Sequence, residues 1–242
     1  MNRTLISIIF LIGTAINAEP LVINKVNYPQ NTIVVDILKL VLSKTNSEMD
    51  IKETKIFNSR PRVVQEVKDG NISLMWAGTT ELMQEQLLAI KIPVLKGLYG
   101  YRILVIREGE QALFDTISNL EQLRQFTAGQ GEYWANNAIM EESSMPMITA
   151  NGQVSLLSML NQKRFDYLNN AIMEPWSELD TYREYKLVVE KKLLLVYPFA
   201  MYFFVSPENK ELAETIKFGL ETAIEDGSYD DLFYKSDLII NT

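Results

Sequence analysis

Apolar residues along the chain follow two alternating patterns, short continuous runs and stripes with helical spacing. The run Ile72–Trp76 has the length of a buried strand, whereas apolar residues three and four positions apart predict a helix over Thr32–Ser43. The clearest stripe recurs every four residues after Ser206, which we expect to cap a helix that Pro207 opens and Gly227 ends. Strands that alternate with helices predict an α/β fold with mostly parallel sheets.

The alternation of strands and helices runs twice along the chain, without a long linker between the two sets. Further strands are expected within Pro20–Val26, Asp50–Phe57, Tyr101–Gly109, Phe126–Trp134, Met145–Ala150 and Arg164–Asn170. Further helices are expected from the Ser59–Pro61 start signal to Gly70, over Val154–Leu160 and over Tyr229–Lys235. Two such sets predict two lobes around a cleft, and ligands of open α/β sheets bind beyond the carboxyl ends of the strands.

Residues 1–18 have the pattern of a secretory signal, with Arg3 as the only charge, an apolar stretch over Leu5–Ile12 and small residues at Ala15 and Ala18. The apolar stretch is shorter than the about 20 residues that a membrane-spanning helix needs. We expect cleavage after Ala18, with cleavage after Ala15 as the alternative, and a soluble protein exported to the periplasm.

The chain contains neither cysteine nor histidine, and its formal net charge is -8. Without cysteine it forms no disulfide and has no thiol for a lipid anchor. Without histidine it has no Ser-His-Asp or Cys-His catalytic pair and no histidine-based metal site. The negative charge argues against binding to nucleic acid or to an anionic membrane surface. We therefore expect a protein that uses no metal and no cofactor and binds no nucleic acid.

Four ordered segments resemble the sequence blocks of one family, the periplasmic solute-binding proteins of the amino-acid-binding type, known as solute-binding family 3. The segments are VVQEVKDGNISLMWAGTT, NLEQLRQFTAGQGEYW, LLSMLNQKRFDYL and SPENKELAETIKFGLETAIEDGSYDDLFYK. No single segment is specific, but their order and spacing are, over about residues 20–236. The segments KIPVLKGLYGYRILVIREG, GQGEYW and LLLVYPFAMYFFVSP also resemble a poorly characterised branch of the family, whose ligands are generally not assigned.

The resemblance implies the type II periplasmic-binding-protein fold, in which two lobes enclose a ligand cleft. Lobe one would hold residues 19–99 and 201–242, and lobe two would hold residues 100–200. Two backbone crossings, near Gly97–Arg102 and Tyr197–Tyr202, would form the hinge between the lobes. Closure would bury a small ligand, which stabilises the closed state by binding it more tightly.

Gly78, Thr79 and Thr80 resemble the turn after the third strand of the family, which in amino-acid binders reads roughly G-x-x-x-T-x-E-R. The arginine of that turn makes a two-pronged bond to the ligand's α-carboxylate, which suits a planar guanidinium. In this chain the arginine position falls on Met83, or on Gln84 if the gap is placed differently. The turn therefore resembles an amino-acid site that lacks its cation.

Two readings of the missing arginine follow. In the first, another cation takes its place, with Arg102 beside the first crossing better placed than Arg60, Arg62 or Lys91. In the second, the ligand has no free α-carboxylate, so that common L-amino acids bind weakly or not at all. An interlobe or surface salt bridge is the alternative role for Arg102.

Polar and aromatic residues at predicted strand ends complete the expected ligand site. Asn169 and Asn170 stand near the place where amino-acid binders often hold the ligand ammonium with an aspartate, and their amides suit a neutral polar group. Glu174 would hold a cation or, as the alternative, begin a helix. Gly129 and Gly131 would let backbone N–H groups face a ligand oxygen, or would form a plain tight turn. The aromatic candidates are Tyr28, Trp76, Trp134, Tyr197 and Tyr202.

These residues predict one pocket between the lobes of a monomeric periplasmic protein that captures a small polar solute. It would deliver the solute to an ABC permease for import or report it to a membrane sensor. The alternatives are a scaffold protein with a degenerate cleft and an enzyme of the dehydratase type on the same fold. The residues expected to converge on the pocket are Trp76, Thr80, Arg102, Trp134 and Asn170.

Overall fold

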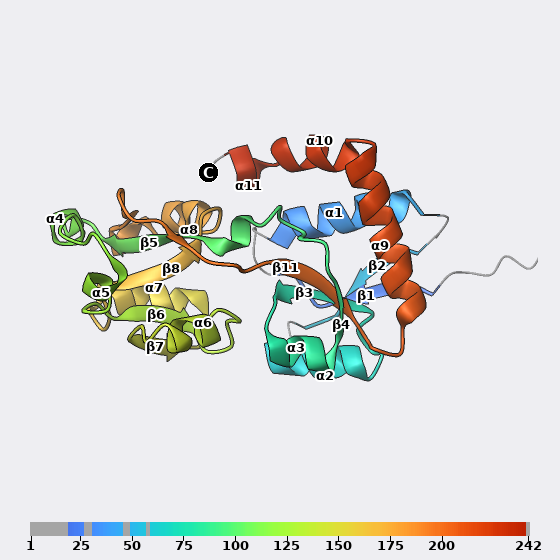
Figure 1. The fold of residues 1–242 in the computed structure, drawn as a ribbon, viewed down its shortest axis with the longest axis horizontal. Coiled ribbons are helices and arrows are strands. Elements are labelled where there is room, and N and C mark those ends of the chain that lie inside the picture. The colour runs from blue at the N-terminus through green and yellow to red at the C-terminus, as the bar shows by residue number, and fades with distance from the viewer. Residues whose placement is uncertain (1–18, 27–30, 46–48, 57–58, 241–242) are drawn as a thin grey trace, which may run out of the picture.

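The computed structural model describes residues 19–26, 31–45, 49–56 and 59–240 (Figure 1). The expected secretion signal over residues 1–18 and the ligand candidate Tyr28 lie outside these ranges. Within the described ranges, no helix is both long enough and apolar enough to cross a membrane.

One end of the molecule contains two small sheets and helices from both ends of the chain (Figure 1). Its strands are β1 (Leu21–Ile23), β2 (Ile51–Glu53), β3 (Leu74–Gly78), β4 (Leu88–Ile90) and β11 (Met201–Val205). Strands β1 and β2 pair in parallel, whereas β11 lies between β3 and β4 and is antiparallel to both. The helices are α1 (Thr32–Ser43), α2 (Arg60–Lys68), α3 (Glu81–Gln86), α9 (Lys210–Glu225), α10 (Ser228–Tyr234) and α11 (Asp237–Ile240).

The sheet of β3, β11 and β4 is covered by helices on both faces. Successive side chains of a strand point to opposite sides, so neighbouring residues pack in different apolar clusters. Leu74 in β3 and Phe203 in β11 pack in one apolar cluster with helices α1, α9 and α10. Their neighbours Met75 and Phe204 pack in a second cluster with α2 and α3. This double burial explains why the consecutive residues Leu74, Met75 and Trp76 are all apolar, and it confirms the predicted buried strand.

The other end of the molecule contains one larger sheet with helices on both faces (Figure 1). Its strands are β5 (Tyr101–Arg107), β6 (Ala128–Gly131), β7 (Met147–Ala150), β8 (Tyr167–Ala171), β9 (Leu187–Val189) and β10 (Leu195–Val196). Their order is β10-β5-β8-β6-β7, and β9 also pairs with β5. The α-helices are α4 (Gln111–Phe114), α5 (Leu120–Leu123), α6 (Asn137–Glu142), α7 (Gln153–Asn161) and α8 (Pro175–Thr181), and the short 3-10 helices are η2 (Leu98–Gly100) and η3 (Arg183–Tyr185).

Three details of the sequence prediction need correction. The sheets are mixed, because β11 and β5 pair only in antiparallel fashion while β1–β2, β6–β7 and β6–β8 are parallel. Helix α9 begins at Lys210, where the Asn209 side chain accepts a hydrogen bond from Leu212 N, and not at Ser206 and Pro207. The expected glycine loop over Gly129–Gly131 is part of strand β6, which is paired on both sides.

The two predicted backbone crossings lie side by side between the two ends of the molecule. Tyr197 N donates to Gly100 O at 3.1 Å, and Thr79 N donates to Ala200 O at 3.0 Å. A Cβ on Gly100 would lie 2.4 Å from the Tyr197 carbonyl oxygen, so only glycine allows this approach of the two segments. The lobe boundaries at residues 99/100 and 200/201 and the hinge function of the crossings stay predictions.

Candidate functional site

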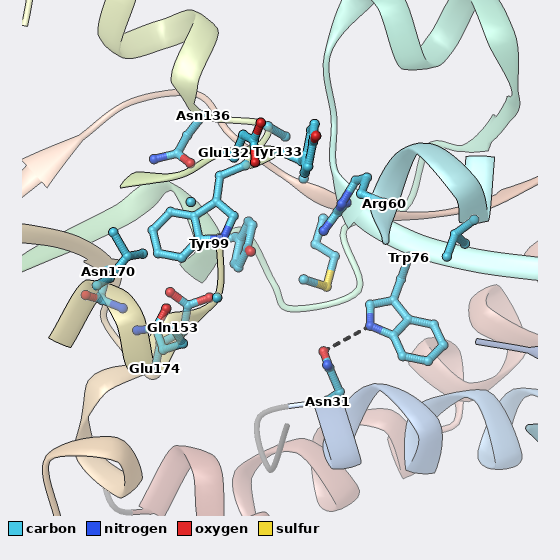
Figure 2. Close-up of a pocket in the computed structure, with 18 of the residues that line it drawn as sticks. Asn31, Arg60, Trp76, Tyr99, Glu132, Tyr133, Asn136, Gln153, Asn170 and Glu174 are labelled. Atoms are coloured by element: carbon cyan, nitrogen blue, oxygen red, sulfur yellow. Dashed lines mark hydrogen bonds between the residues drawn. The ribbon is translucent and has the colours of Figure 1, made fainter. Parts of the chain in front are cut away.

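A cavity of about 500 Å³ lies between the two ends of the molecule, within the volume range of small-molecule sites (Figure 2). Its wall is formed by the segments after β1, β6 and β7, by the starts of α1, α2 and α8, and by both backbone crossings. Several of these segments follow the carboxyl ends of strands, as the topological rule predicts. The charged side chains in the wall are Lys25, Arg60, Arg102, Glu132, Glu174 and Glu178.

The backbone crossings contribute aromatic rings to the cavity wall. The Tyr99 ring stacks on the Phe199 ring, with centroids 5.3 Å apart. The Phe199 ring also fills the space next to Gly78, where a Cβ would lie 2.2 Å from its Cζ atom. Gly78 lines the cavity and admits this ring, so the glycine of the predicted turn has a packing role.

Two tryptophans line the cavity from opposite ends of the molecule. Trp76 in β3 donates its indole N–H to Asn31 Oδ1 at 3.1 Å, which fixes the ring at the start of α1 (Figure 2). Trp134, after β6, lies against the backbone of Gly131, where a Cβ would be 2.2 Å from the indole nitrogen. Both rings therefore offer an apolar face to a ligand while their positions are held by local contacts.

Arg102 is held inside the wall by neutral hydrogen-bond acceptors. Its side chain is 2% exposed, and it donates to Asn169 Oδ1 at 3.2 Å, to Asn169 O at 2.6 Å and to Tyr99 O at 3.3 Å. The Asn169 amide in turn donates to the Tyr197 hydroxyl at 3.5 Å, and Asn136 donates to the same hydroxyl at 3.4 Å. Arg102 forms no salt bridge with any described residue. The alternative role of Arg102, a salt bridge at the surface or between the lobes, is therefore not found within the described part of the chain.

Two residues of the cavity wall each have a buried polar atom without a hydrogen-bond partner. The atoms are the Nη1 donor of Arg60, at the start of α2, and the Oδ1 acceptor of Asn170 in β8. Asn170 as a whole is only 2% exposed. Buried polar atoms are rarely left unpaired in folded proteins, so each such atom requires an explanation.

The acidic part of the wall lies near the start of α8. Glu174 precedes this helix, and its Oε2 atom accepts a hydrogen bond from Ala171 N at 2.8 Å. Burial, and then the Glu174 carboxylate, raise the pKa of the Tyr99 hydroxyl, which therefore stays protonated as a hydrogen-bond donor. Glu174 thus lies at the helix start, as the alternative role predicted, and it also lines the cavity, whereas its role in holding a cation stays a prediction. Within the described residues, no three acidic side chains lie close enough together to hold a metal ion.

The cavity brings together half of the ligand residues that the sequence singled out. Four of the five residues expected to converge are in the wall, and Thr80 is the exception. The predicted ligand residues that line the cavity are Trp76, Gly78, Arg102, Gly131, Trp134, Asn170 and Glu174.

Six predicted ligand residues have other surroundings. Tyr202 in β11 packs against the cluster that contains Met75 and Phe204. Thr80 accepts a hydrogen bond from Met83 N at 3.2 Å and so caps α3, and Thr79 pairs with Ala200 through its backbone. Gly129 lies under the Phe165 ring, Asn169 binds Arg102, and Tyr197 supports Asn136 from behind the wall. The two hydroxyls and Gly129 were misplaced because a strand-end position alone does not say which side of the strand a residue faces.

Neither residue at the missing arginine position reaches the cavity. Met83 is 8% exposed and packs with Val63 and Val67 of α2, whereas Gln84 is exposed on the surface of α3. Neither residue therefore supplies a ligand contact in the cavity wall.

The sequence prediction ranked Arg60 behind Arg102, whereas the structure places the unpaired donor of Arg60 in the wall. The signal was present, because residue 60 starts the helix that follows strand β2, and helix starts after parallel strands face the ligand side. The wall also contains Asn31, Asn136 and Gln153, which local sequence patterns did not single out (Figure 2).

Replacing Gly131 by alanine is expected to push the Trp134 indole out of the wall, because the new Cβ would lie within 2.2 Å of the indole nitrogen. Tryptophan emission should shift to longer wavelength as the ring becomes more exposed, while the melting temperature changes by less than about 4 °C. Glu141→Ala, on the exposed face of α6, is the control and should leave the emission spectrum unchanged. An unchanged emission spectrum would contradict this packing.

No protein-family model matches the chain, and no curated protein matches it. Solved structures do match. An ancestral arginine-binding protein bound to glutamine has a TM-score of 0.69 at 16% identity, over 90% of this chain and 97% of that one. The substrate-binding protein of an amino acid ABC transporter has a TM-score of 0.67 at 12% identity, over 90% and 98%. A histidine kinase sensor domain with similarity to periplasmic binding proteins has a TM-score of 0.69 at 15% identity, over 90% and 94%.

These likenesses show that the chain has the fold of periplasmic binding proteins, as the sequence resemblance predicted, but with mixed rather than mostly parallel strand pairing. At identities of 12–16% they show the fold alone and assign neither a solute nor a partner. The chemistry of the site must therefore be argued from the cavity itself.

Proposed function

We propose that this protein is a non-catalytic binding protein that captures a small polar solute in the cavity between its two ends. The observation that carries the proposal is the cavity of about 500 Å³, lined by tryptophan and tyrosine rings and by unpaired polar atoms. Apolar rings with a few convergent polar groups are the usual composition of a small-molecule site. Export to the periplasm, inferred from residues 1–18, belongs to the same proposal.

Two uses of the captured solute are supported by neighbours in fold. One solved structure of this fold is the substrate-binding protein of an ABC transporter, and another is a kinase sensor domain. We therefore propose either delivery to an ABC permease or signalling to a membrane sensor, with closure of the cavity as the common step. The charged and amide groups in the wall favour a polar solute over a lipid-like one.

A thermal-shift screen over sugars, peptides, organic acids, amino acids and polyamines tests the proposal. A solute at a hundredfold excess over its Kd adds about 2.7 kcal/mol to the free energy of unfolding. For a chain of this size, that corresponds to a rise in melting temperature of about 5–10 °C. We expect at least one class of solute to give a saturable rise.

A variant that blocks the cavity provides the control for the screen. Asn151→Trp places a large ring at the exposed rim and should abolish the rise without lowering the melting temperature of the free protein. Glu214→Trp, on the exposed face of α9, should bind like the unmodified chain. If no solute class stabilises the protein, the degenerate-scaffold alternative replaces this proposal.

A further inference from the structure

We propose that Arg60 is the anion-binding residue of this cavity, and that the captured solute carries a carboxylate for Arg60 and a hydrogen-bond donor for Asn170. The inference rests on the proposed function and names the class of solute. In this proposal Arg60, at the start of α2, takes over the function of the arginine that the resemblance would place at Met83 or Gln84 in α3.

The first argument is that Arg60 has a buried donor without an acceptor. Its Nη1 atom has less than 1 Å² of exposed surface and no hydrogen-bond partner. Within the described residues no carboxylate lies within salt-bridge distance of Arg60. Arg62, two residues further along the same helix, is mostly exposed and forms a salt bridge with Glu66. Arg62 is thus paired within the protein, whereas the Nη1 donor of Arg60 has no acceptor among the described residues.

The second argument is electrostatic. Burial lowers the pKa of the Arg60 guanidinium, and the nearby Tyr99 opposes this effect. An arginine remains protonated in proteins, so the buried charge is retained at a cost to the free protein. A ligand carboxylate would supply the missing negative charge and two parallel acceptors, which is the geometry that a guanidinium binds best.

The third argument is that each side-chain nitrogen atom of Arg102 already has a hydrogen-bond partner in the protein. Its three side-chain nitrogen atoms donate to Asn169 and to the Tyr99 carbonyl, so it positions wall residues and adds only positive potential. Of the two arginines in the wall, Arg60 is the one with a buried nitrogen atom that has no hydrogen-bond partner.

The acceptor on the other side of the cavity sets the second part of the ligand. Asn170 Oδ1 is buried and unpaired, so it requires an N–H or O–H donor. Glu174 lies on the same side and keeps one carboxylate oxygen bonded to Ala171 N. Figure 2 shows Arg60 on one side of the cavity and Asn170 with Glu174 on the other. A solute with a carboxylate at one end and a donor at the other matches this polarity.

The acids in the wall favour a carboxylate over a phosphate or sulfate. Glu132, Glu174 and Glu178 face the same cavity as Arg60 and Arg102. A doubly charged anion would meet repulsion from these acids, whereas a single carboxylate needs only one paired cation. Small hydroxy acids and amino acids therefore fit the site better than inorganic phosphate.

The test compares carboxylic acids with their primary amides, which have the same shape and no charge. The panel contains hydroxy acids, amino acids, the corresponding amides, inorganic phosphate and inorganic sulfate, with binding measured by thermal shift and calorimetry. We expect at least one acid to bind at least about 100-fold more tightly than its amide, the size of lost charge-assisted hydrogen bonds. Phosphate and sulfate should not stabilise the protein.

Two variants separate Arg60 from its surroundings. Arg60→Gln should weaken binding of that acid by about 100-fold, whereas Arg62→Gln, the matched exposed control, should leave it within twofold. Arg60→Met should raise the melting temperature of the ligand-free protein by about 2–4 °C, because it removes a buried unpaired charge. Asn170→Ala should weaken binding about tenfold through loss of its acceptor.

Several results would overturn the inference. Equal binding of an acid and its amide, unchanged binding by Arg60→Gln, or a clear loss of ligand-free stability in Arg60→Met would each contradict it. A neutral sugar or a phosphate as the tight ligand would leave the binding function in place and reject the carboxylate class. A protein that no solute stabilises would contradict both the function and the inference.

Discussion

Replacing Arg102 by methionine is expected to lower the free energy of unfolding by about 3 kcal/mol. The substitution leaves Asn169 Oδ1, Asn169 O and Tyr99 O without the donor that each of them now has. Those acceptors lie in a wall where Arg102 is only 2% exposed, so water does not readily replace the guanidinium. Chemical denaturation of the ligand-free protein measures the change.

Arg183→Met is the control for this experiment. Arg183 is exposed and contacts Asp180 within the same turn, so its loss should change the free energy of unfolding by less than about 0.5 kcal/mol. The sequence offered Arg102 as one candidate cation for the ligand, with a salt bridge as the alternative role, and neither role includes the hydrogen bonds to Asn169 and Tyr99. An unchanged free energy of unfolding in Arg102→Met would contradict a structural role for these bonds.

Replacing Gly219 by alanine is expected to destabilise the protein by about 2 kcal/mol, against the trend of helix propensity. Alanine in an exposed helix interior is more favourable than glycine by about 1 kcal/mol. At Gly219 the added Cβ would lie 2.4 Å from the Val41 carbonyl oxygen, so α9 would have to move away from α1. The sign of the change in melting temperature therefore reports directly on this close approach.

Glu214→Ala provides the comparison within the same helix. Glu214 is exposed on α9, and alanine there should leave the melting temperature nearly unchanged. If Gly219→Ala raised the melting temperature, α1 and α9 would have room between them, contrary to the 2.4 Å approach.

The alternation of strands and helices was readable in the sequence because side-chain periodicity is a local property. The run Ile72–Trp76 predicted a buried strand, and Leu74 and Met75 are indeed buried on opposite faces of β3. Whether strands pair in parallel or antiparallel fashion was harder to predict, because β11 comes from late in the chain and lies between β3 and β4. The pairing of strands that are distant in sequence leaves no local pattern.

The candidate site was predicted in part, for a similar reason. Trp76, Trp134 and Asn170 were placed in the cavity by their positions after or within strands that end at the cleft. Thr80 shares that kind of position but caps α3, and Arg102 points into a cage of neutral acceptors. A strand-end position predicts nearness to the cleft, and only the packed neighbours decide whether a side chain faces it.

The amino-acid sequence by itself determined the alternation of elements and the expectation of a periplasmic-binding-protein fold. The tertiary structure alone showed that Arg60 and Arg102, which are the same residue type, differ in their hydrogen-bond partners. It also decided the roles of Gly100 and Gly219, where backbone carbonyls from distant segments occupy the space of a side chain. Hydrophobic periodicity acts between residues a few positions apart, whereas hydrogen-bond saturation and close packing depend on residues that meet only after folding.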